Sequence, residues 1–512
     1  MNGADSEAVT LAVLARRRAE TGPDVEAVAD DEGALAFGPL LEQAEALAAS
    51  LHELGLRRGD VLSFQLPNWR ETAILNVAAS LAGLVCNPIV PIYRDAELGA
   101  ILHDSGARCL VVPGTWRGYD YASAAARLRH ALPALQHIVT VRAAMPGMLA
   151  FEDLVADGRG RAIRTGDADA DAVKLLLFTS GTTGRAKGVQ HSHRSLTAPL
   201  LRAMRRWGVG EGDGLIMPSP VTHVTGYCCG LELPFTVGAR TLLMERWDAD
   251  RALALIDARS IAATVGATPF LQELADAAEA AGRAPASLRV FACGGASVPP
   301  ALIRHASALL GCSAFRVYGL SEAPLVTFGV DGDDPQDVAA ETDGRINDYD
   351  VRIDGGTEGE ILIRGSGLFL GYKDPAADAD SFTPDGYFRT GDIGRRVHGD
   401  ALVITGRKKD LIIRGGENIS AREIEDVLLA DPRIADAAAV AIPHERLGET
   451  VGLFLVAAPG SSVTLGDVRA LLDDAGLAAQ KRPEALFHVE SLPRTASGKV
   501  RKDVLRERIG MK

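Results

Sequence analysis

The stretch Phe178-Thr-Ser-Gly-Thr-Thr-Gly-Arg-Ala-Lys-Gly-Val189 combines hydroxyl side chains, glycines and one lysine in a short segment. It follows the apolar run 173–178, which predicts a buried strand. Glycines let backbone N–H groups approach phosphate oxygens without a Cβ in the way, while hydroxyls and a lysine add hydrogen bonds and charge. A surface turn rarely needs this combination directly after a buried strand. The stretch therefore predicts a loop that binds a triphosphate.

This loop differs from the Walker phosphate loop, in which Gly-Lys is followed by Ser or Thr. Here Lys187 follows Ala186 and precedes Gly188. The residues expected to hold phosphate are Thr179, Ser180, Gly181, Thr182, Thr183, Gly184 and Lys187.

Size, charge and apolar content restrict the class of protein. The chain has 512 residues, a formal net charge of −13 and a hydrophobic fraction of 47%. This length predicts about three or more domains or subdomains. The acidic charge argues against a nucleic-acid surface and fits a cytoplasmic enzyme of small molecules, with a homodimer left open.

Neither a signal peptide nor a membrane span is expected. The N-terminal residues lack a basic start and an apolar core. The apolar stretch 73–90 contains Asn76, Asn87 and Pro88, so it predicts a buried helix that leads into a strand. The six cysteines lie in apolar surroundings and are expected to be reduced, buried thiols.

The order of apolar segments predicts an α/β fold. From about residue 35 to 385, strand-like runs alternate with amphipathic segments, including an expected helix over 223–237, which argues for sheets covered by helices on both faces. A small β-rich subdomain is expected at about 343–406. A charged segment at 407–410 then separates the large unit 1–406 from a small α+β unit at 411–512.

The order Thr-Ser-Gly-Thr-Thr-Gly-x-x-Lys-Gly resembles the signature of the adenylate-forming (ANL) superfamily, which includes acyl-CoA synthetases, adenylation domains and beetle luciferases. The family usually has proline where this chain has Ala186. Further blocks match in the expected order over nearly the whole chain, with Ser321 in place of the family's threonine. These blocks are 218–223, 294–296, 318–322, 389–392, 405–410 and 493–499.

The resemblance implies an ATP site that spans the chain. Lys187 and the loop hydroxyls would hold the β- and γ-phosphates, Glu322 would bind Mg²⁺, and Asp392 would accept both ribose hydroxyls. Lys499 would bridge the substrate carboxylate and the α-phosphate. Tyr318 would stack on adenine, and Arg407 would reach ribose or phosphate. The remaining expected nucleotide contacts are Gly294, Gly295, Ala296, Gly319 and Ser321.

The block 218–223 resembles the one that opens the acid pocket in the family. The segment 220–229 in that neighbourhood carries no carboxylate, so the ammonium of an amino-acid substrate would be buried there without a counter-charge. A mostly apolar monocarboxylic acid is therefore expected. The segments 63–69 and 87–93 resemble those of cyclohexanecarboxylate and medium-chain acyl-CoA ligases. The residues expected to line the acid pocket are His223, Thr225, Tyr227, Cys228 and Val317, and His223 joins Lys187, Glu322 and Lys499 as an expected catalytic residue.

The resemblance also implies a second half-reaction, in which a mobile C-terminal domain rotates about Lys409 and coenzyme A accepts the acyl group. Arg414, Gly415 and Gly416 would line the pantetheine tunnel. Three alternatives remain open: an enzyme that loads a separate carrier protein, a luciferase-like oxidase, and a binding protein without catalysis.

Lys409→Pro tests the expected hinge. Proline fixes φ, so we expect acyl-adenylate formation to persist and thioester formation to fall. Pyrophosphate release and thioester yield, measured separately, report the two steps. A parallel loss of both steps, or of neither, would show that Lys409 is not a hinge.

Overall fold

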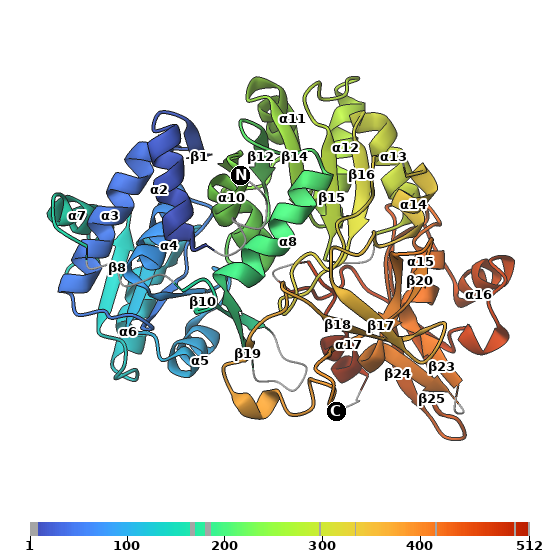
Figure 1. Cartoon of the computed structure of the whole chain (residues 1–512). Helices are drawn as coiled ribbons and strands as arrows, with labels where there is room; N and C mark the ends of the chain where they lie inside the picture. The colour runs from blue at the N-terminus through green and yellow to red at the C-terminus, as the bar shows by residue number, and fades with distance from the viewer. Residues whose placement is uncertain are drawn as a thin grey trace.

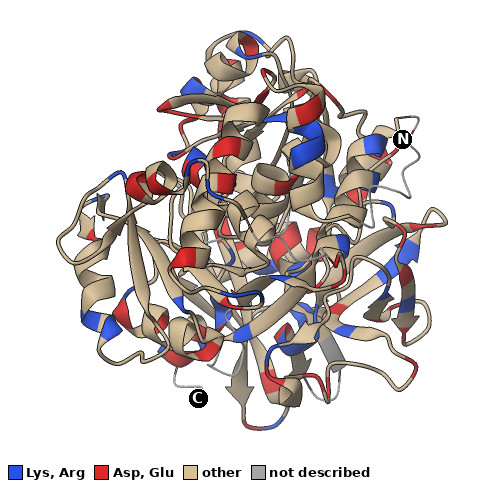
Figure 2. Cartoon of the chain, turned by 60° about the vertical axis from the view of Figure 1, so that its left-hand side comes forward, with Lys and Arg blue, Asp and Glu red and all other residues tan. Residues whose placement is uncertain are grey.

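A computed structural model of the chain describes residues 9–163, 169–179, 186–295, 298–332, 334–414, 417–495 and 498–509. Two mostly parallel sheets form the N-terminal part, and a four-stranded and a five-stranded sheet follow toward the C-terminus (Figure 1). The predicted α/β class is confirmed. Acidic and basic positions are interspersed along the elements (Figure 2). In the described part of the chain, no helix has the length and apolarity needed to cross a membrane.

The eight-stranded sheet is buried on both faces. Along one of its strands, Cys109 and Val111 enter one hydrophobic core while Leu110 and Val112 enter the other. This explains why its strands read as continuous apolar runs. In order across the sheet, the strands are β19 (Gly371–Tyr372), β11 (Lys187–Ser192), β10 (Val173–Thr179), β4 (Val85–Pro88), β3 (Val61–Phe64), β5 (Cys109–Pro113), β8 (His137–Val141) and β9 (Leu149–Ala150).

Helices supply both cores of this sheet. The first core takes residues from α2 (Leu11–Thr21), α3 (Phe37–Glu53), α4 (Arg70–Ala82) and α7 (Phe151–Gly158). The second takes residues from α5 (Asp95–Ser105) and α6 (Tyr121–Arg129), and a short hairpin of β6 (Thr115–Trp116) and β7 (Tyr119–Asp120) precedes α6. The stretch 73–90 is thus a buried helix followed by a strand, as predicted.

The seven-stranded sheet lies beside the first. Its strands are β16 (Ser313–Val317), β15 (Val290–Gly294), β14 (Ile261–Gly266), β12 (Gly214–Met217), β13 (Arg240–Leu243), β1 (Glu26–Asp30) and β2 (Gly33–Ala36), all parallel except β2. Its helices are α8 (His193–Arg206), α11 (Ala249–Ala258), α12 (Thr268–Ala280), α13 (Pro300–Leu310) and α14 (Gln336–Glu341).

The predicted helix over 223–237 is confirmed from Val224 to Val237, but it contains a π-helical turn that was not predicted. The segment forms α9 (Val224–Gly226), a π-helix η1 (Tyr227–Glu232) and α10 (Leu233–Val237). A π-helix has a wider turn than an α-helix and occurs rarely, often at functional sites. The apolar sequence gave no periodic signal for this change of helix type.

The C-terminal part contains two smaller sheets. The four-stranded sheet has the order β17 (Asp350–Asp354), β18 (Gly359–Arg364), β20 (Phe388–Val397) and β21 (Ala401–Arg407). The five-stranded sheet contains β22 (Leu411–Arg414), β23 (Glu417–Ser420), β24 (Ile434–His444), β25 (Gly448–Ala457) and β26 (Ala485–His488). The helices are η2 (Pro375–Ala377), η3 (Lys408–Asp410), α15 (Ala421–Leu428), α16 (Leu465–Asp474), η4 (Ala479–Lys481) and α17 (Lys502–Arg508). The domain boundaries stay a prediction.

All six cysteines are buried and free of disulfides, as expected. Burial disfavours the charged thiolate. It raises the pKa of Cys86 to about 11 and the pKa values of Cys109, Cys229, Cys293 and Cys312 to about 12, and it raises the pKa of Cys228 as well.

Gly158→Ala tests how closely α7 packs on α3. A Cβ at Gly158 would lie 1.9 Å from the carbonyl oxygen of Ala46, which is rigid backbone. We expect a loss of about 1–3 kcal/mol in the free energy of unfolding, measured by denaturant titration. The control is Gly210→Ala, where a Cβ meets no atom within 4 Å and the change should stay within about 0.5 kcal/mol. Equal stability of both variants would contradict the packing.

Candidate active site

The glycine-rich loop joins two antiparallel strands. Thr179 ends β10 and Lys187 begins β11, and the two residues are directly paired. The predicted phosphate contacts Ser180, Gly181, Thr182, Thr183 and Gly184 lie outside the described residues. The ammonium of Lys187 lies 4.5 Å from the ring centroid of Tyr372, within cation–π range. The lysine therefore stands at the base of the predicted loop, on an aromatic face.

Tyr372 also contacts the predicted metal ligand. Its hydroxyl donates a hydrogen bond of 2.8 Å to Oε1 of half-buried Glu322, and the N–H of Phe369 donates to the carbonyl of Glu322 at 2.8 Å. Burial and the Glu322 charge raise the pKa of Tyr372, so the phenol stays protonated and can donate. Sequence reasoning missed Tyr372, since the residues around it carry no motif used in the prediction.

The predicted ribose ligand is held by two partners. Asp392 is buried, its Oδ2 accepts from the Tyr318 hydroxyl at 2.7 Å, and its Oδ1 lies 2.9 Å from Nε of Arg407. The pairing of β20 with β21 sets Asp392 opposite Arg407. The Asp392 charge raises the pKa of Arg407, and burial followed by the same charge raises the pKa of Tyr318. In the sequence these three residues lie in three separate motifs, so their direct contact could be expected only from the family resemblance.

Lys499 of the C-terminal part lies close to charges of the N-terminal part and of the segment 407–410. It is half-buried, and burial lowers the pKa of its ammonium to about 8. Arg407 and Lys409 lower this pKa further, while Asp392 and Glu322 raise it. The backbone N–H of Lys499 donates to Oγ1 of Thr495 at 3.1 Å. The predicted catalytic lysine thus lies near Asp392, Arg407 and Glu322.

His223 lies near Lys499 and is neutral. Burial, followed by the Lys499 charge, lowers the pKa of His223 to about 4. Its Nε2 is buried and has no hydrogen-bond partner among the described residues. A buried polar atom without a partner often marks a functional position.

The predicted acid-pocket residues differ in exposure. Thr225 and Val317 are half-buried, while Cys228 and Tyr227 are buried. The Tyr227 hydroxyl donates to Oδ1 of Asn76 at 2.5 Å, so this group is directed at α4. Whether these residues line an acid pocket stays a prediction.

Glycines allow close backbone contact on the predicted adenine side. A Cβ on Gly294 would lie 2.5 Å from the carbonyl oxygen of Val317, and one on Gly319 would lie 2.8 Å from the backbone nitrogen of Leu325. Gly295 has φ +85°, a left-handed conformation that favours glycine. Ala296 lies outside the described residues.

The block around Ser321 has a further support that the sequence did not reveal. Nε2 of His191 lies 2.7 Å from the carbonyl oxygen of Ser321, and Nδ1 lies 2.9 Å from Oγ of Ser195. Burial lowers the pKa of His191 to about 4, so the imidazole is neutral and can donate from one nitrogen and accept at the other. His191 therefore connects β11 to the loop that carries Glu322.

The predicted hinge and thiol-tunnel residues lie on the C-terminal side. Lys409 is exposed within η3, and its carbonyl oxygen accepts from Arg506 at 3.4 Å. Arg414 donates to the carbonyl oxygen of Gln480 at 2.6 Å and also contacts Glu484. Gly415 and Gly416 lie outside the described residues.

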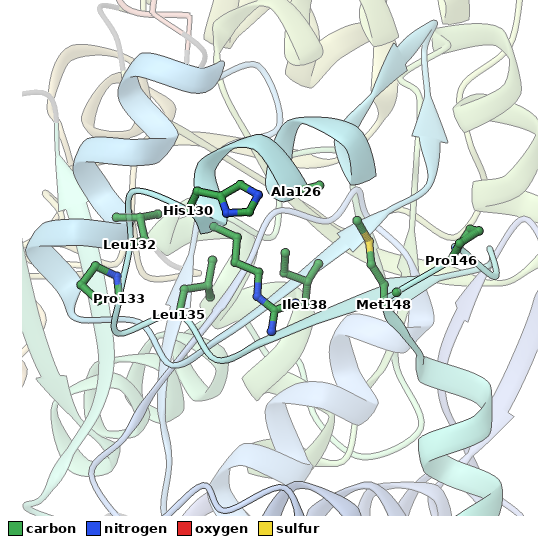
Figure 3. Close-up of a pocket in the computed structure, with 10 residues that line it drawn as sticks. Ala126, His130, Leu132, Pro133, Leu135, Ile138, Pro146 and Met148 are labelled. Carbon is green, nitrogen blue, oxygen red and sulfur yellow. The ribbon is translucent and has the colours of Figure 1, made fainter.

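A separate hollow is formed by α6, β8 and the segment before β9 (Figure 3). Its lining includes His130, Leu135, Ile138 and Met148. None of the predicted site residues lines it, so it is distinct from the cluster around Lys499.

Comparisons with known proteins agree with these motifs. The AMP-binding enzyme family matches residues 15–373, and the AMP-binding enzyme C-terminal domain matches residues 423–499. The chain belongs to the AMP-binding enzyme family, which confirms the predicted adenylate-forming superfamily. It is accordingly an ATP-binding ligase of the AMP-forming, acid–thiol type.

Individual relatives cover nearly the whole chain. The medium-chain fatty-acid–CoA ligase of Escherichia coli (strain K12) is 35% identical over 516 residues, which cover 98% of this chain and 90% of the relative. The salicyl-AMP ligase / salicyl-S-ArCP synthetase of Mycobacterium tuberculosis (strain ATCC 25618 / H37Rv) is 32% identical over 521 residues, 98% of this chain and 91% of the relative. The crystal structure of ATP-bound MatB from Rhodopseudomonas palustris superposes with a TM-score of 0.86 at 28% identity, covering 97% of this chain and 98% of that chain.

The lowered pKa of Lys499 predicts a pH dependence. If the protonated ammonium acts in adenylation, kcat/KM for pyrophosphate release should fall as pH rises through about 8. Arg407→Gln removes a positive neighbour that lowers this pKa, so the fall should move to higher pH. Pyrophosphate release measured across pH checks both statements.

Lys499→Ala is the control for this titration, because its residual activity should no longer fall as the pH rises through about 8. If activity falls at the same pH as in the wild type in both Arg407→Gln and Lys499→Ala, the titrating group is not Lys499.

Proposed function

We propose that the chain is an ATP-dependent carboxylate–CoA ligase. A carboxylate oxygen of the acid attacks the α-phosphorus of ATP, which gives acyl-AMP and expels pyrophosphate. The thiol of coenzyme A then attacks the acyl carbon, which gives the thioester and releases AMP. The observation that carries this proposal is the meeting of three motifs at Asp392, where the Tyr318 hydroxyl lies at 2.7 Å and Nε of Arg407 at 2.9 Å. Lys499 interacts electrostatically with Asp392 and Glu322 beside them.

The first step brings anionic groups together, so the site must neutralise charge. Lys499 would stabilise the substrate carboxylate and the α-phosphate, and Lys187 would bind the outer phosphates. The carboxylate of Glu322, oriented by Tyr372, suits a hard cation that prefers oxygen ligands. Mg²⁺ bound there would supply positive charge to the phosphates.

The nucleoside would bind beside Asp392. This carboxylate is fixed by Tyr318 and Arg407, and each of its oxygens can accept a further hydrogen bond, as a vicinal diol requires. The close packing of Gly294 on Val317 leaves no room for a side chain next to the predicted adenine contact.

The acid is proposed to be an apolar monocarboxylate. His223 is neutral, and the segment 220–229 has no carboxylate. Glu232 follows in η1, but it is paired with Lys174 and so is already neutralised. A substrate ammonium would therefore lack a counter-charge from this segment. The E. coli relative named for medium-chain fatty acids agrees with this choice.

Thioester formation is proposed to need a second pose of the C-terminal part. Rotation at Lys409 would withdraw Lys499 and bring Arg414, Gly415 and Gly416 to the thiol tunnel. Exclusion of water during this exchange would protect the mixed anhydride from hydrolysis.

Transfer to a carrier protein is the second candidate function. It is favoured by the 32% identity to a ligase named for both salicyl-AMP and a carrier-bound product. The adenylation step is common to both candidates, so only the acceptor separates them.

A panel of carboxylic acids scored by pyrophosphate release, with and without coenzyme A, tests the proposal. We expect release with apolar monocarboxylates and formation of acyl-CoA. Lys499→Ala should lower the adenylation rate by ~10²–10³, while thioester formation from supplied acyl-AMP persists. Lys481→Ala is the control, because that lysine pairs with Glu423 within the C-terminal part.

Two outcomes would contradict the proposal. Pyrophosphate release without thioester formation from coenzyme A, but with transfer to a carrier protein, would establish the second candidate. Equal loss of both steps in Lys499→Ala would reject the assigned role of the lysine.

A further inference from the structure

The π-helix lies against a buried pair of opposite charges. Nζ of Lys174 on β10 contacts Oε1 of Glu232 at the end of η1, and each side chain is only 1% exposed. Neither residue belongs to the motifs of the proposed reaction. Burial of two charges removes their hydration, and the attraction between them often does no more than offset that loss. A stability role alone therefore explains the pair poorly.

Asn76 of α4 connects this pair to Tyr227. Its Nδ2 donates to Oε1 of Glu232 at 2.7 Å, while its Oδ1 accepts from Nζ of Lys174 at 3.3 Å and from the Tyr227 hydroxyl at 2.5 Å. Asn76, Lys174, Tyr227 and Glu232 are called the Asn76 cluster below. The cluster joins α4, β10 and η1, and its bonds to Lys174 and Glu232 involve charged groups, which makes them stronger than neutral hydrogen bonds.

The cluster explains why the helix widens at this point. Tyr227 and Glu232 are five residues apart, a spacing that puts side chains about 140° apart on an α-helix. The i→i+5 hydrogen bonds of a π-helix bring residues of this spacing close to one side. Both side chains can then reach Asn76, as observed. An α-helical turn would direct one of them away.

The widened turn is continuous with the proposed acid-pocket wall. His223 and Thr225 precede η1 directly, and Cys228 lies within it. A Cβ on Gly226 would lie only 2.0 Å from the carbonyl oxygen of Pro220, so the segment is packed tightly on backbone. A shift of η1 would therefore move the wall as a unit.

We propose that the Asn76 cluster positions the wall formed by residues 223–228 and thereby determines which carboxylic acids the enzyme accepts. The cluster holds the π-turn through the side chains of Tyr227 and Glu232, and the position of the π-turn determines the positions of Thr225 and Cys228. Oε2 of Glu232 has no hydrogen-bond partner among the described residues, so Asn76 and Lys174 supply the contacts that hold this carboxylate. This inference rests on the proposed function.

Two double variants separate hydrogen bonding from charge. Lys174→Met with Glu232→Gln removes both charges but leaves an amide that Asn76 can bind. Lys174→Met with Glu232→Leu removes the charges and the hydrogen bonds at similar volume. KM and kcat are measured for each acid that the wild type accepts, and KM for ATP is measured alongside.

Lys174→Met with Glu232→Leu, the Met/Leu variant, should raise KM for the best acid at least fivefold and change the order of preference among the acids. Its KM for ATP should stay within twofold of the wild-type value. Lys174→Met with Glu232→Gln is the Met/Gln variant. The Met/Gln variant should retain the wild-type order. Tyr227→Phe, which removes one oxygen, should shift the acid KM in the same direction. The control is Tyr121→Phe, which removes a buried hydroxyl that donates to Pro91 in the other core.

A purely structural cluster would lower the melting temperature and the active fraction, and so reduce kcat equally for all acids without a change in KM. Such a result in both Tyr227→Phe and the Met/Leu variant would overturn the inference. If the Met/Leu variant does not fold, an unchanged KM for the acid in Tyr227→Phe would overturn it as well. Absence of any acid-dependent activity in the wild type would instead reject the proposed function.

Discussion

The candidate active site depends on the ammonium of Lys499, which lies close to other charged side chains of both signs. Lys499 is half-buried, and Arg407 and Lys409 disfavour its protonated form, while Asp392 and Glu322 favour it. Without these two carboxylates, the C-terminal part would meet net repulsion there. In the proposed reaction, the anionic substrates add the charge that this arrangement lacks. The electrostatics of the free enzyme are thus complementary to a filled site.

Support for this site comes from residues outside the family motifs. Tyr372 connects Glu322 to Lys187, and His191 fixes the backbone at Ser321. Both are neutral donors in buried surroundings, so they restrict motion without adding charge. The Asn76 cluster differs from these contacts, because a pair of charged side chains, Lys174 and Glu232, holds the π-helical turn behind the proposed acid pocket. Both kinds of support, neutral donors and a neutralised ion pair, fix a side chain without adding net charge to its surroundings.

The parts of this structure that follow local rules could be predicted from sequence. The apolar run 173–178 predicted a buried strand, which the structure shows as β10, and ordered motifs predicted the superfamily. Strand β11 was not assigned, because Lys187–Ser192 is largely polar and carries no apolar run, although it pairs with the preceding strand β10 and with β19. The π-turn could not be predicted, since Tyr227 within it contacts Asn76, a residue 151 positions away in the sequence. Lys174 was hidden within an apolar run, and Tyr372 contacts Glu322 across 50 residues.

The six buried thiols have a chemical consequence for an enzyme that makes mixed anhydrides. An acyl-adenylate is an electrophile, and the thiolate is the reactive form of a cysteine. Their raised pKa values keep them protonated at neutral pH, and burial keeps them out of contact with solvent. Self-acylation is thereby suppressed, and the activated acyl group is reserved for a sulfur that arrives from outside.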